Sequence, residues 1–535
     1  MTTLVRDLPL PLGHGPAELH AAVAGQLGLH LDAIVEARIR KVSLDARGKN
    51  PKRVLTVEVW TTADAPPPDE SPRLRIGTPL ARPSPGKMPI IVGTGPAGLW
   101  AALRLLEGGH PSILLDRGGA LVARHRDVVA LRSHGQLNPE SNLCFGAGGA
   151  GTYSDGKLYT RRRDPEIDRI HADLVALGAP ASIMTDAHPH VGTNRIIMAY
   201  KRLEAFLVEH GCEVRYDAKV VDLLQADSGR VHGVVLASGE TLEGPGVILA
   251  TGHSARDVYR WLHARGVLME RKAFAIGARC EHPQALIDRI QYGPHAENPD
   301  LEPAEYFLKA QVADRGVYSF CMCPGGFVIP TPTEADCLNV NGMSNHKRGT
   351  RFANAALVAT VEPRDFWISR PGDLDHLGPL AGLAFQRHLE QAAFRAGGGG
   401  YRAPAQRLTD FLTKRQGTLP AETSFRPGLT SVDLHAIIPA RFGDAIARAV
   451  LRFDQKMRGY HTAEAVLIGV ETTTSSPVRL VRSDDHQAPG FPGLFPAGEG
   501  AGQAGGIVSS ALDGLRVAES LLAGLAAPAA SFAVA

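Results

Sequence analysis

Two short apolar runs joined by a helical segment stand near the start of the main part of the chain. Ile90–Val92 carries only apolar side chains, as a strand buried on both faces of a parallel sheet does. Helical spacing covers 99–107, Gly108 and Gly109 end it, and the second apolar run is 113–115. The pattern predicts a β–α–β unit.

Three glycines connect the first run to the helix with the spacing G-x-G-x-x-G. Gly93 would form the tight turn, Gly95 would let the backbone approach a pyrophosphate, and Gly98 would let the helix pack on the strand. Pro96 and Ala97 open the helix, whose first N–H groups and partial positive charge favour phosphate oxygens. We therefore expect a dinucleotide site.

An acid closes the second apolar run. Asp116 is predicted to accept hydrogen bonds from a ribose diol, with Arg117 beside it. An NAD site and the ADP half of an FAD site both fit these residues.

The α/β pattern continues to residue 256 and returns at the end of the chain. Helical spacing covers 196–210, and strands are predicted at 213–216, 218–224, 231–237 and 247–250. The long segment 257–463 is mixed, and 464–535 ends in a strand, a glycine-rich turn and a helix. We predict a nucleotide-binding domain formed by 88–256 and 464–535, with 257–463 inserted as a substrate domain.

The first 63 residues form a separate pattern. A helix over 16–27 and alternating strands over 34–40 and 54–60 predict a small βαββ-like α+β module, and the Pro-rich segment 64–87 reads as a stiff linker. The module is rich in basic residues, including Arg38 and Arg40. These residues favour either an RNA contact or, as the preferred interpretation, a solvated strand face.

Charge balance, apolar runs and cysteine spacing argue against several classes of protein. The 535 residues carry 57 basic and 55 acidic side chains, a balance that offers no field for nucleic acid or an anionic membrane. Apolar runs are too short to span a bilayer, and the N-terminus lacks the pattern of a signal peptide, so we expect a cytoplasmic protein. The six cysteines lack zinc spacing, and no metal site is predicted.

A second glycine-rich loop and two short segments are expected around the cofactor. In the loop 145–158, small residues admit a flat ligand and polar side chains add contacts. Weaker signals are a strand residue expected near adenine and an Ala-Thr-Gly strand end. The residues concerned are Gly149, Gly151, Ser154, Lys157, Val220, Thr251 and Gly252.

A glycine-framed acid near the end of the chain decides between NAD and FAD. Gly498 and Glu499 follow an apolar run, and Gly505, Gly506 and Ile507 lead into an amphipathic helix. The acid can bind ribityl hydroxyls, and the helix N-terminus can stabilise a reduced flavin. NAD has no ribityl chain, so the two acids together favour FAD.

Several segments in series resemble one family. GAGTYSDGKLYT, HPHVGTNRI, ATGHSARDVY, EHPQALIDRIQYG, GVYSFCMCPGG, GVETTTSSPVR and FPAGEGAGQAGGIVSSALDG are similar to the FAD-dependent dehydrogenase (NAD/FAD-utilising dehydrogenase) family of bacteria and plant plastids. The resemblance implies an α/β fold with a glutathione-reductase-like, two-dinucleotide-type FAD-binding Rossmann domain, an inserted α+β substrate domain and the N-terminal module. Asp116 stands where such flavoproteins often have Glu, and Ala147 where the family usually has an acid.

Candidate catalytic residues come from three places. Cys321 and Cys323 follow a strand pattern and would share one face of a regular strand, as flavin-facing thiols or as buried cysteines. Glu471 and Arg479 lie in a polar cluster, as substrate ligands or as a structural ion pair. His346 is a candidate proton carrier among 21 histidines.

The combined interpretation is an FAD-dependent oxidoreductase that passes hydride between a small-molecule substrate and tightly bound FAD. A second Rossmann fingerprint is absent, which disfavours a dedicated NAD(P)H domain but leaves NAD(P)H as a transient electron donor. The alternatives are an FAD-dependent RNA-modification enzyme and a non-catalytic FAD-binding redox sensor or scaffold. The sequence leaves the substrate and the oligomeric state open.

Overall fold

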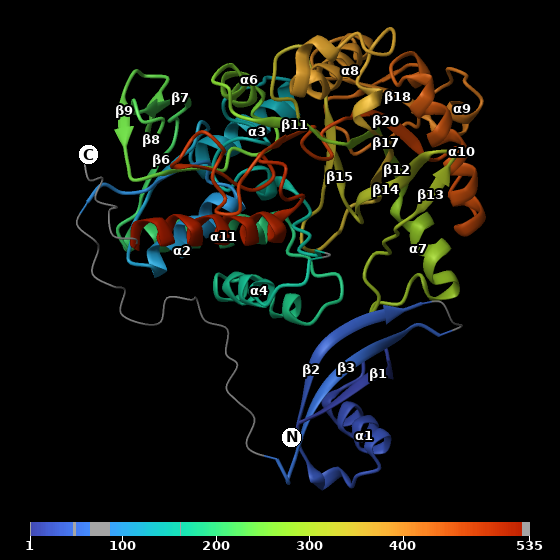
Figure 1. Ribbon diagram of the computed structural model, residues 1–535. Helices are drawn as coiled ribbons and strands as arrows, with labels where there is room; N and C mark the ends of the chain where they lie inside the picture. Colours follow the sequence, from blue (N-terminus) through green and yellow to red (C-terminus); the bar gives the residue numbers. More distant parts are fainter. Residues whose placement is uncertain (1, 47–49, 65–85, 161, 527–535) are drawn as a thin grey trace.

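The computed structural model describes residues 2–46, 50–64, 86–160 and 162–526 (Figure 1). The predicted linker over 64–87 therefore lies almost wholly outside the described residues. None of the described helices is long and apolar enough to cross a membrane.

The N-terminal module has the expected β–α–β–β order and lies at the bottom of Figure 1. Its elements are β1 (Thr3–Pro11), α1 (Pro16–Leu27), β2 (Ile34–Asp45) and β3 (Lys52–Thr61), and its sheet order is β1-β3-β2. Leu19 and Val23 of α1 pack against Leu55 and Val57 of the central strand. One amphipathic helix on one sheet face gives the module a core of its own.

A five-stranded parallel sheet forms the nucleotide side of the molecule. Its order is β22 (Leu494–Pro496), β10 (Val247–Leu249), β4 (Ile90–Val92), β5 (Ile113–Leu115) and β6 (Glu213–Arg215). β22 comes from the end of the chain and pairs with β10, so two distant segments complete one sheet. Strands near residues 90 and 490 therefore belong to one sheet, and the division of the domain into 88–256 and 464–535 stays a prediction.

The five-stranded sheet is covered on both faces, which is why four of its strands are wholly apolar; the edge strand β6 instead carries Glu213 and Arg215. One face packs on α2 (Pro96–Glu107), α5 (Thr193–Glu209) and α11 (Ile507–Ala526), with α4 (Glu166–Ala176) beyond them. The other face meets the antiparallel strands β7 (Val220–Gln225), β8 (Val231–Leu236) and β9 (Thr241–Glu243), together with α6 (Arg256–Ala264). Figure 1 shows α2 and α11 side by side.

A seven-stranded sheet forms the other half of the main body. Its order is β13 (Lys309–Val312), β14 (Arg315–Cys323), β17 (Phe352–Val361), β12 (Phe274–Pro283), β20 (Val466–Glu471), β18 (Ala403–Arg407) and β19 (Leu429–Ser431). It forms one core with α8 (Ala381–Gly397) and α10 (Ala440–Lys456). β20 pairs with β12 and β18, so this strand belongs with the inserted segment, eight residues beyond the predicted boundary at 463.

The remaining elements are short. They are α3 (Leu121–His134), α7 (Gln284–Tyr292), α9 (Leu408–Leu412) and the strand pairs β11 (Met269–Arg271) with β21 (Val478–Leu480) and β15 (Phe327–Pro330) with β16 (Val340–Met343). The N-terminal module joins the main body through β2. Val42 donates its backbone N–H to Thr185 O at 2.8 Å, and its carbonyl accepts from Ala187 N at 2.9 Å.

Candidate functional site

A single cavity of about 1570 Å³ runs from the five-stranded sheet to the seven-stranded sheet. Its nucleotide end is lined by Gly93, Gly95, Asp116 and the N-terminus of α11, and its far end by residues of β14. The volume exceeds the roughly 300–1000 Å³ of an ordinary small-molecule pocket. The cavity therefore has room for an extended dinucleotide and for a second ligand.

The glycine-rich turn after β4 is shaped by close backbone approach. Gly93 has φ +110°, and a Cβ on it would lie 2.3 Å from Ala250 O. A Cβ on Gly98 would lie 1.9 Å from Gly93 O, so Gly98 serves helix packing and does not line the cavity. Pro96 and Ala97, at the start of α2, do line it. The first turn of α2 thus faces a space that suits a phosphate.

Asp116 lines the cavity, but its carboxylate is already occupied by the protein. Oδ2 accepts from Thr94 N at 3.0 Å and Thr94 Oγ1 at 2.6 Å. Oδ1 accepts from Gly118 N at 3.0 Å and Gly146 N at 2.9 Å. A carboxylate has about four acceptor positions, so this acid holds the surrounding loops. Its contact with a ribose stays a prediction.

Arg117 and Val220 line the same end of the cavity. The Arg117 guanidinium lies over the Phe145 ring, 4.7 Å from its centroid, and pairs with Asp257. Thr251 and Gly252, at the end of β10, form part of the same wall. These four predicted residues are therefore brought together.

A buried arginine organises the second glycine-rich loop. Arg124 of α3 has no exposed surface and donates to five backbone carbonyls between residues 142 and 149. Burial lowers its pKa. Among the described residues, no carboxylate forms an ion pair with it. The loop is thus fixed around a buried positive charge, which favours an anion nearby.

The loop places its predicted residues along the cavity wall. Gly149, Gly151, Ser154 and Lys157 all line it. Ser154 Oγ donates to Gly151 O at 2.8 Å, and the Lys157 ammonium donates to the carbonyl of Met322 on β14. Lys157 therefore joins the loop to the seven-stranded sheet.

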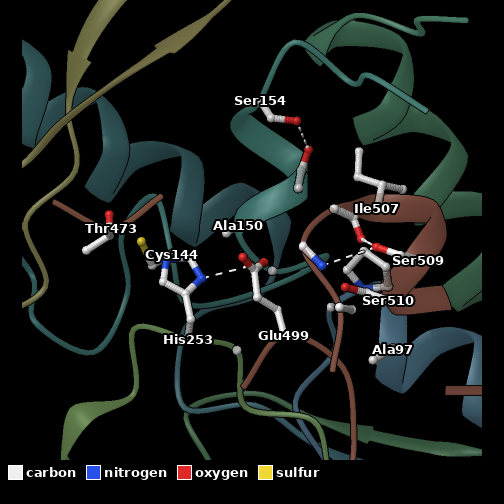
Figure 2. A pocket seen from close by; sticks show the side chains of 18 of the residues that line it. Ala97, Cys144, Ala150, Ser154, His253, Thr473, Glu499, Ile507, Ser509 and Ser510 are labelled. Carbon is white, nitrogen blue, oxygen red and sulfur yellow. Dashed lines mark hydrogen bonds and ion pairs between the residues drawn. The ribbon is translucent and has the colours of Figure 1, made fainter. Parts of the chain in front are cut away.

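Glu499 points into the middle of the cavity toward His253 (Figure 2). Its Oε2 lies 3.6 Å from His253 Nδ1. Gly505, Gly506 and Ile507 line the cavity at the start of α11. Gly498 does not line it; its N–H donates to Oδ2 of Asp513 in α11 at 2.6 Å. The acid and the helix N-terminus are therefore brought to one wall.

Cys321 lies at the far end of the cavity, on an irregular strand. The pairing of β14 with β17 shifts register between Phe320 and Cys323, and Cys321 has φ +47°. The sequence predicted a regular strand with both thiols on one face. Instead the bulge sends Cys321 to the cavity and leaves Cys323 wholly buried.

A second buried arginine holds this bulge. Arg279 of β12 donates to Cys321 O at 2.8 Å and to both carboxylate oxygens of Glu471, at 2.6 and 3.1 Å. It also donates to Asn341 Oδ1 at 2.6 Å and Asn354 Oδ1 at 3.2 Å. Burial raises the pKa of Glu471 to about 7 despite this partner. Arg279 therefore positions the backbone of Cys321.

Three candidate catalytic residues lie away from the cavity. Glu471 is buried against Arg279, because β12 and β20 are neighbours, and it does not meet Arg479. Arg479 is half exposed, with Glu270 3.9 Å away. His346 stacks on His190 at 5.6 Å between ring centroids, with its Nδ1 3.2 Å from Val191 O. The predicted Glu471–Arg479 pair is replaced by two pairs with different partners.

Sequence reasoning missed the residues that support the site. Arg124 and Arg279 hold its two ends, and His253 faces Glu499. Arg348, which is 6% exposed, lines the far end with its Nε unpaired. A basic residue inside an apolar strand pattern, as at Arg279 in FAIGARCEHP, was the available signal.

Two of the basic side chains of the N-terminal module have acidic partners. Arg38 pairs with Glu36 at 2.8 Å and lies over the Trp60 ring, and Arg40 pairs with Glu58. Arg47 and Lys49, two further basic residues of this segment, lie outside the described residues.

Comparisons with known proteins agree with this site. Residues 273–474 match the family described as FAD-dependent protein, C-terminal domain-like, and residues 3–60 match a domain of unknown function. With this family match and a cavity shaped for a dinucleotide, the cofactor is FAD.

Two solved structures are similar to this chain at a low level. A geranylgeranyl bacteriochlorophyll reductase-like protein of Thermoplasma acidophilum is 12% identical over 82% of this chain and 78% of that chain, with a TM-score of 0.37. A mutant of the halogenase PltM in complex with FAD is 13% identical over 82% and 69%, with a TM-score of 0.36. At this similarity their activities say nothing of this chain.

One relative is much closer. An uncharacterized protein of Clostridium beijerinckii is 42% identical over 438 residues, which are 81% of this chain and 80% of that protein. Identity at this level over most of both chains goes with a common fold. The chain therefore belongs to the same family as the clostridial protein.

Proposed function

We propose that this protein is an FAD-dependent oxidoreductase that acts on a small molecule at the far end of its cavity. The observation that carries the proposal is the continuity of that cavity. One space joins the glycine-rich turn after β4, the start of α11 and the bulge at Cys321.

In this proposal, FAD lies extended along the nucleotide half. The first turn of α2 holds the pyrophosphate, and Asp116 and Arg117 lie near the adenosine. Glu499 accepts from the ribityl hydroxyls, and the start of α11 faces the flavin. The glutathione-reductase-like division into 88–256 and 464–535 is part of this proposal, supported by the pairing of β22 with β10.

The flavin supplies hydride acceptance and donation at N5 when bound, and the protein supplies position and charge. His253, beside Glu499, can hold a proton near the middle of the cavity. Tyr318 and Phe320 of β14 give the far end an aromatic wall, and Arg348 and Lys157 place positive charge there. This end therefore suits a small molecule with an apolar part and a polar group.

Anaerobic titration of the purified protein tests the proposal. Flavin absorbance should accompany the protein, and a panel of donors that includes NADH, NADPH, thiols and hydroxy acids should bleach it. Protein that takes up no FAD would contradict the proposal. A flavin that resists every donor, and after chemical reduction every acceptor, would favour the scaffold alternative.

NAD(P)H as a transient donor is tested in the same titration. Rapid bleaching by NADH or NADPH would support it, and bleaching by other donors alone would contradict it. RNA that remains bound through salt washes would instead favour the RNA-modification alternative.

A further inference from the structure

Two cysteines lie at the far end of the cavity. Cys321 lines the cavity, and Cys323 is fully buried. The Cys323 thiol donates a hydrogen bond to the Cys321 carbonyl oxygen, with its Sγ 3.3 Å from that oxygen. The bulge thus places the Cys323 side chain against the backbone of Cys321, whereas a regular strand would hold the two cysteines near the upper limit for a disulfide.

The charges around the pair differ for the two sulfurs. Lys157 donates to the carbonyl of Met322, the residue between the cysteines, and Arg279 donates to the carbonyl of Cys321. Asp155 also faces the pair, with its Oδ2 3.9 Å from the Lys157 ammonium, and Glu471 is neutralised by Arg279. Two cations and two acids therefore surround the cysteines, and each cation also has a backbone carbonyl of the Cys321–Met322 segment as its acceptor.

This environment favours the thiolate form of Cys321 and the thiol form of Cys323. The neighbouring Cys323 thiol, aided by Lys157 and Arg279, lowers the pKa of Cys321 to about 5, although burial and Asp155 oppose it. The neighbouring Cys321 side chain and burial raise the pKa of Cys323 well above its usual value. An accessible thiolate beside a buried thiol is the arrangement of an attacking cysteine and its resolving partner.

We propose that Cys321 and Cys323 form a redox-active dithiol that exchanges electron pairs with FAD and with a small thiol or disulfide substrate. This inference deepens the proposed function and rests on it for the role of FAD. A small thiol or disulfide would then be the substrate that binds at the far end of the cavity.

Reduction of a substrate disulfide takes two thiol–disulfide exchange steps. The Cys321 thiolate attacks one sulfur of a substrate disulfide and releases the other as a thiolate. Cys323 then loses its proton, attacks the Cys321 sulfur and releases the second substrate thiolate, leaving a Cys321–Cys323 disulfide. Restoring the thiolate and the thiol takes two electrons and one proton, which FAD in its reduced form would supply when bound in the nucleotide half of the cavity.

Trapping in glutathione redox buffers tests the dithiol directly. The full-length protein is equilibrated over a range of reduced and oxidised glutathione and alkylated with iodoacetamide, and the peptide holding both cysteines is weighed. We expect both cysteines alkylated in the reducing buffers, and an intramolecular disulfide, lighter by two hydrogens, in the oxidising ones. Cys321→Ser and Cys323→Ser should each abolish that disulfide. Alkylation of both cysteines in every buffer would overturn the proposal.

The pH dependence of alkylation tests the assigned roles. The alkylation rate of Cys321 should rise with pH around a midpoint near pH 5 and then stay constant, because only the thiolate reacts. Cys144 lines the same cavity, but burial raises its pKa, so its rate should still rise above pH 8. Lys157→Met and Cys323→Ala should both move the Cys321 midpoint upward, since each removes a group that stabilises the thiolate. A midpoint near 8.5, as in a free cysteine, would overturn the assignment.

These measurements separate the dithiol from the proposed function, because both can be read in protein without FAD. Failure to bind FAD would contradict the proposed function alone. Flavin that is bleached by other donors, in protein whose cysteines never pair, would contradict the dithiol alone. With FAD bound, Cys321→Ser should slow bleaching by dithiothreitol at least about tenfold, since the attacking thiolate is lost. Cys212→Ser, at a buried cysteine away from the cavity, should leave it unchanged.

Discussion

Two fully buried arginines hold the two ends of the cavity in different ways. Arg124 gives its donors to five backbone carbonyls of one loop. Arg279 gives its donors to a carboxylate, two side-chain amides and one carbonyl, on strands far apart in the sequence. Both are wholly inaccessible, so each charge has lost its water.

The difference lies in the charge that remains. Glu471 neutralises Arg279, so a buried ion pair supports the backbone of Cys321. Arg124 receives only carbonyl dipoles, and burial lowers its pKa without an acid in contact. The charge of Arg124 is therefore balanced only at longer range, by groups such as Asp116. Five variants test this comparison.

Arg124→Leu should have the largest effect. It leaves five buried carbonyls without their donor, so we expect the free energy of unfolding to fall by about 4 kcal/mol and the protein to lose FAD. Denaturant titration and the flavin-to-protein ratio measure both. Arg126→Leu, at an exposed position on the same helix, is the matched control and should change neither. An Arg124→Leu variant that keeps its FAD would show that Arg124 does not support cofactor binding at the nucleotide end of the cavity.

Arg279→Leu should lower the free energy of unfolding by about 3 kcal/mol, because it leaves the buried Glu471 carboxylate without its partner. Burial already raises the pKa of Glu471 to about 7, and without Arg279 it rises further. The folded state then holds a proton that the unfolded state releases above about pH 4.5, so stability should fall as pH rises from 5 to 8.

The double variant Arg279→Leu, Glu471→Leu should recover more than half of that loss, since no charge is left unpaired. Arg124 has no such rescue, because no acid accompanies it among the described residues. Denaturant titrations at pH 5 and pH 8 measure both effects. A double variant as unstable as the single one would show that Arg279 acts through Asn341, Asn354 and Cys321 instead.

Glu499→Gln should have a moderate effect confined to cofactor binding. Loss of a charged acceptor for hydroxyl groups should weaken FAD binding by about 1–2 kcal/mol, while stability without FAD stays unchanged. Fluorescence titration of the protein with FAD measures the affinity. Equal affinity in both proteins would place the ribityl chain away from this wall.

Arg479→Ala should have the smallest effect, below about 0.5 kcal/mol. This side chain is 48% exposed, and its acid lies 3.9 Å away, so water already screens it. Thermal melts and flavin bleaching with a working donor should match the unchanged protein. A large loss of turnover would restore Arg479 as a substrate ligand.

Sequence spacing and local composition predicted the β–α–β unit at the nucleotide end of the cavity. Gly93 and Gly98 are constrained by atoms of the same turn and the adjacent strand, and Ile90–Val92 reads as buried from composition alone. The far end depends on strand neighbours that spacing does not encode. Glu471 is close in sequence to Arg479, yet sheet order places it beside Arg279. The bulge at Cys321 also has no local signature, so a regular strand was expected.

The attachment of β2 gives the N-terminal module a role that its basic surface does not suggest. Its ladder to residues 185–187 ends directly before His188 and Pro189, which line the cavity. Removing the module would leave backbone groups there without partners. The module thus fixes the backbone of the segment that leads into this part of the cavity wall, so its removal should be felt in the cavity as well as in the module itself.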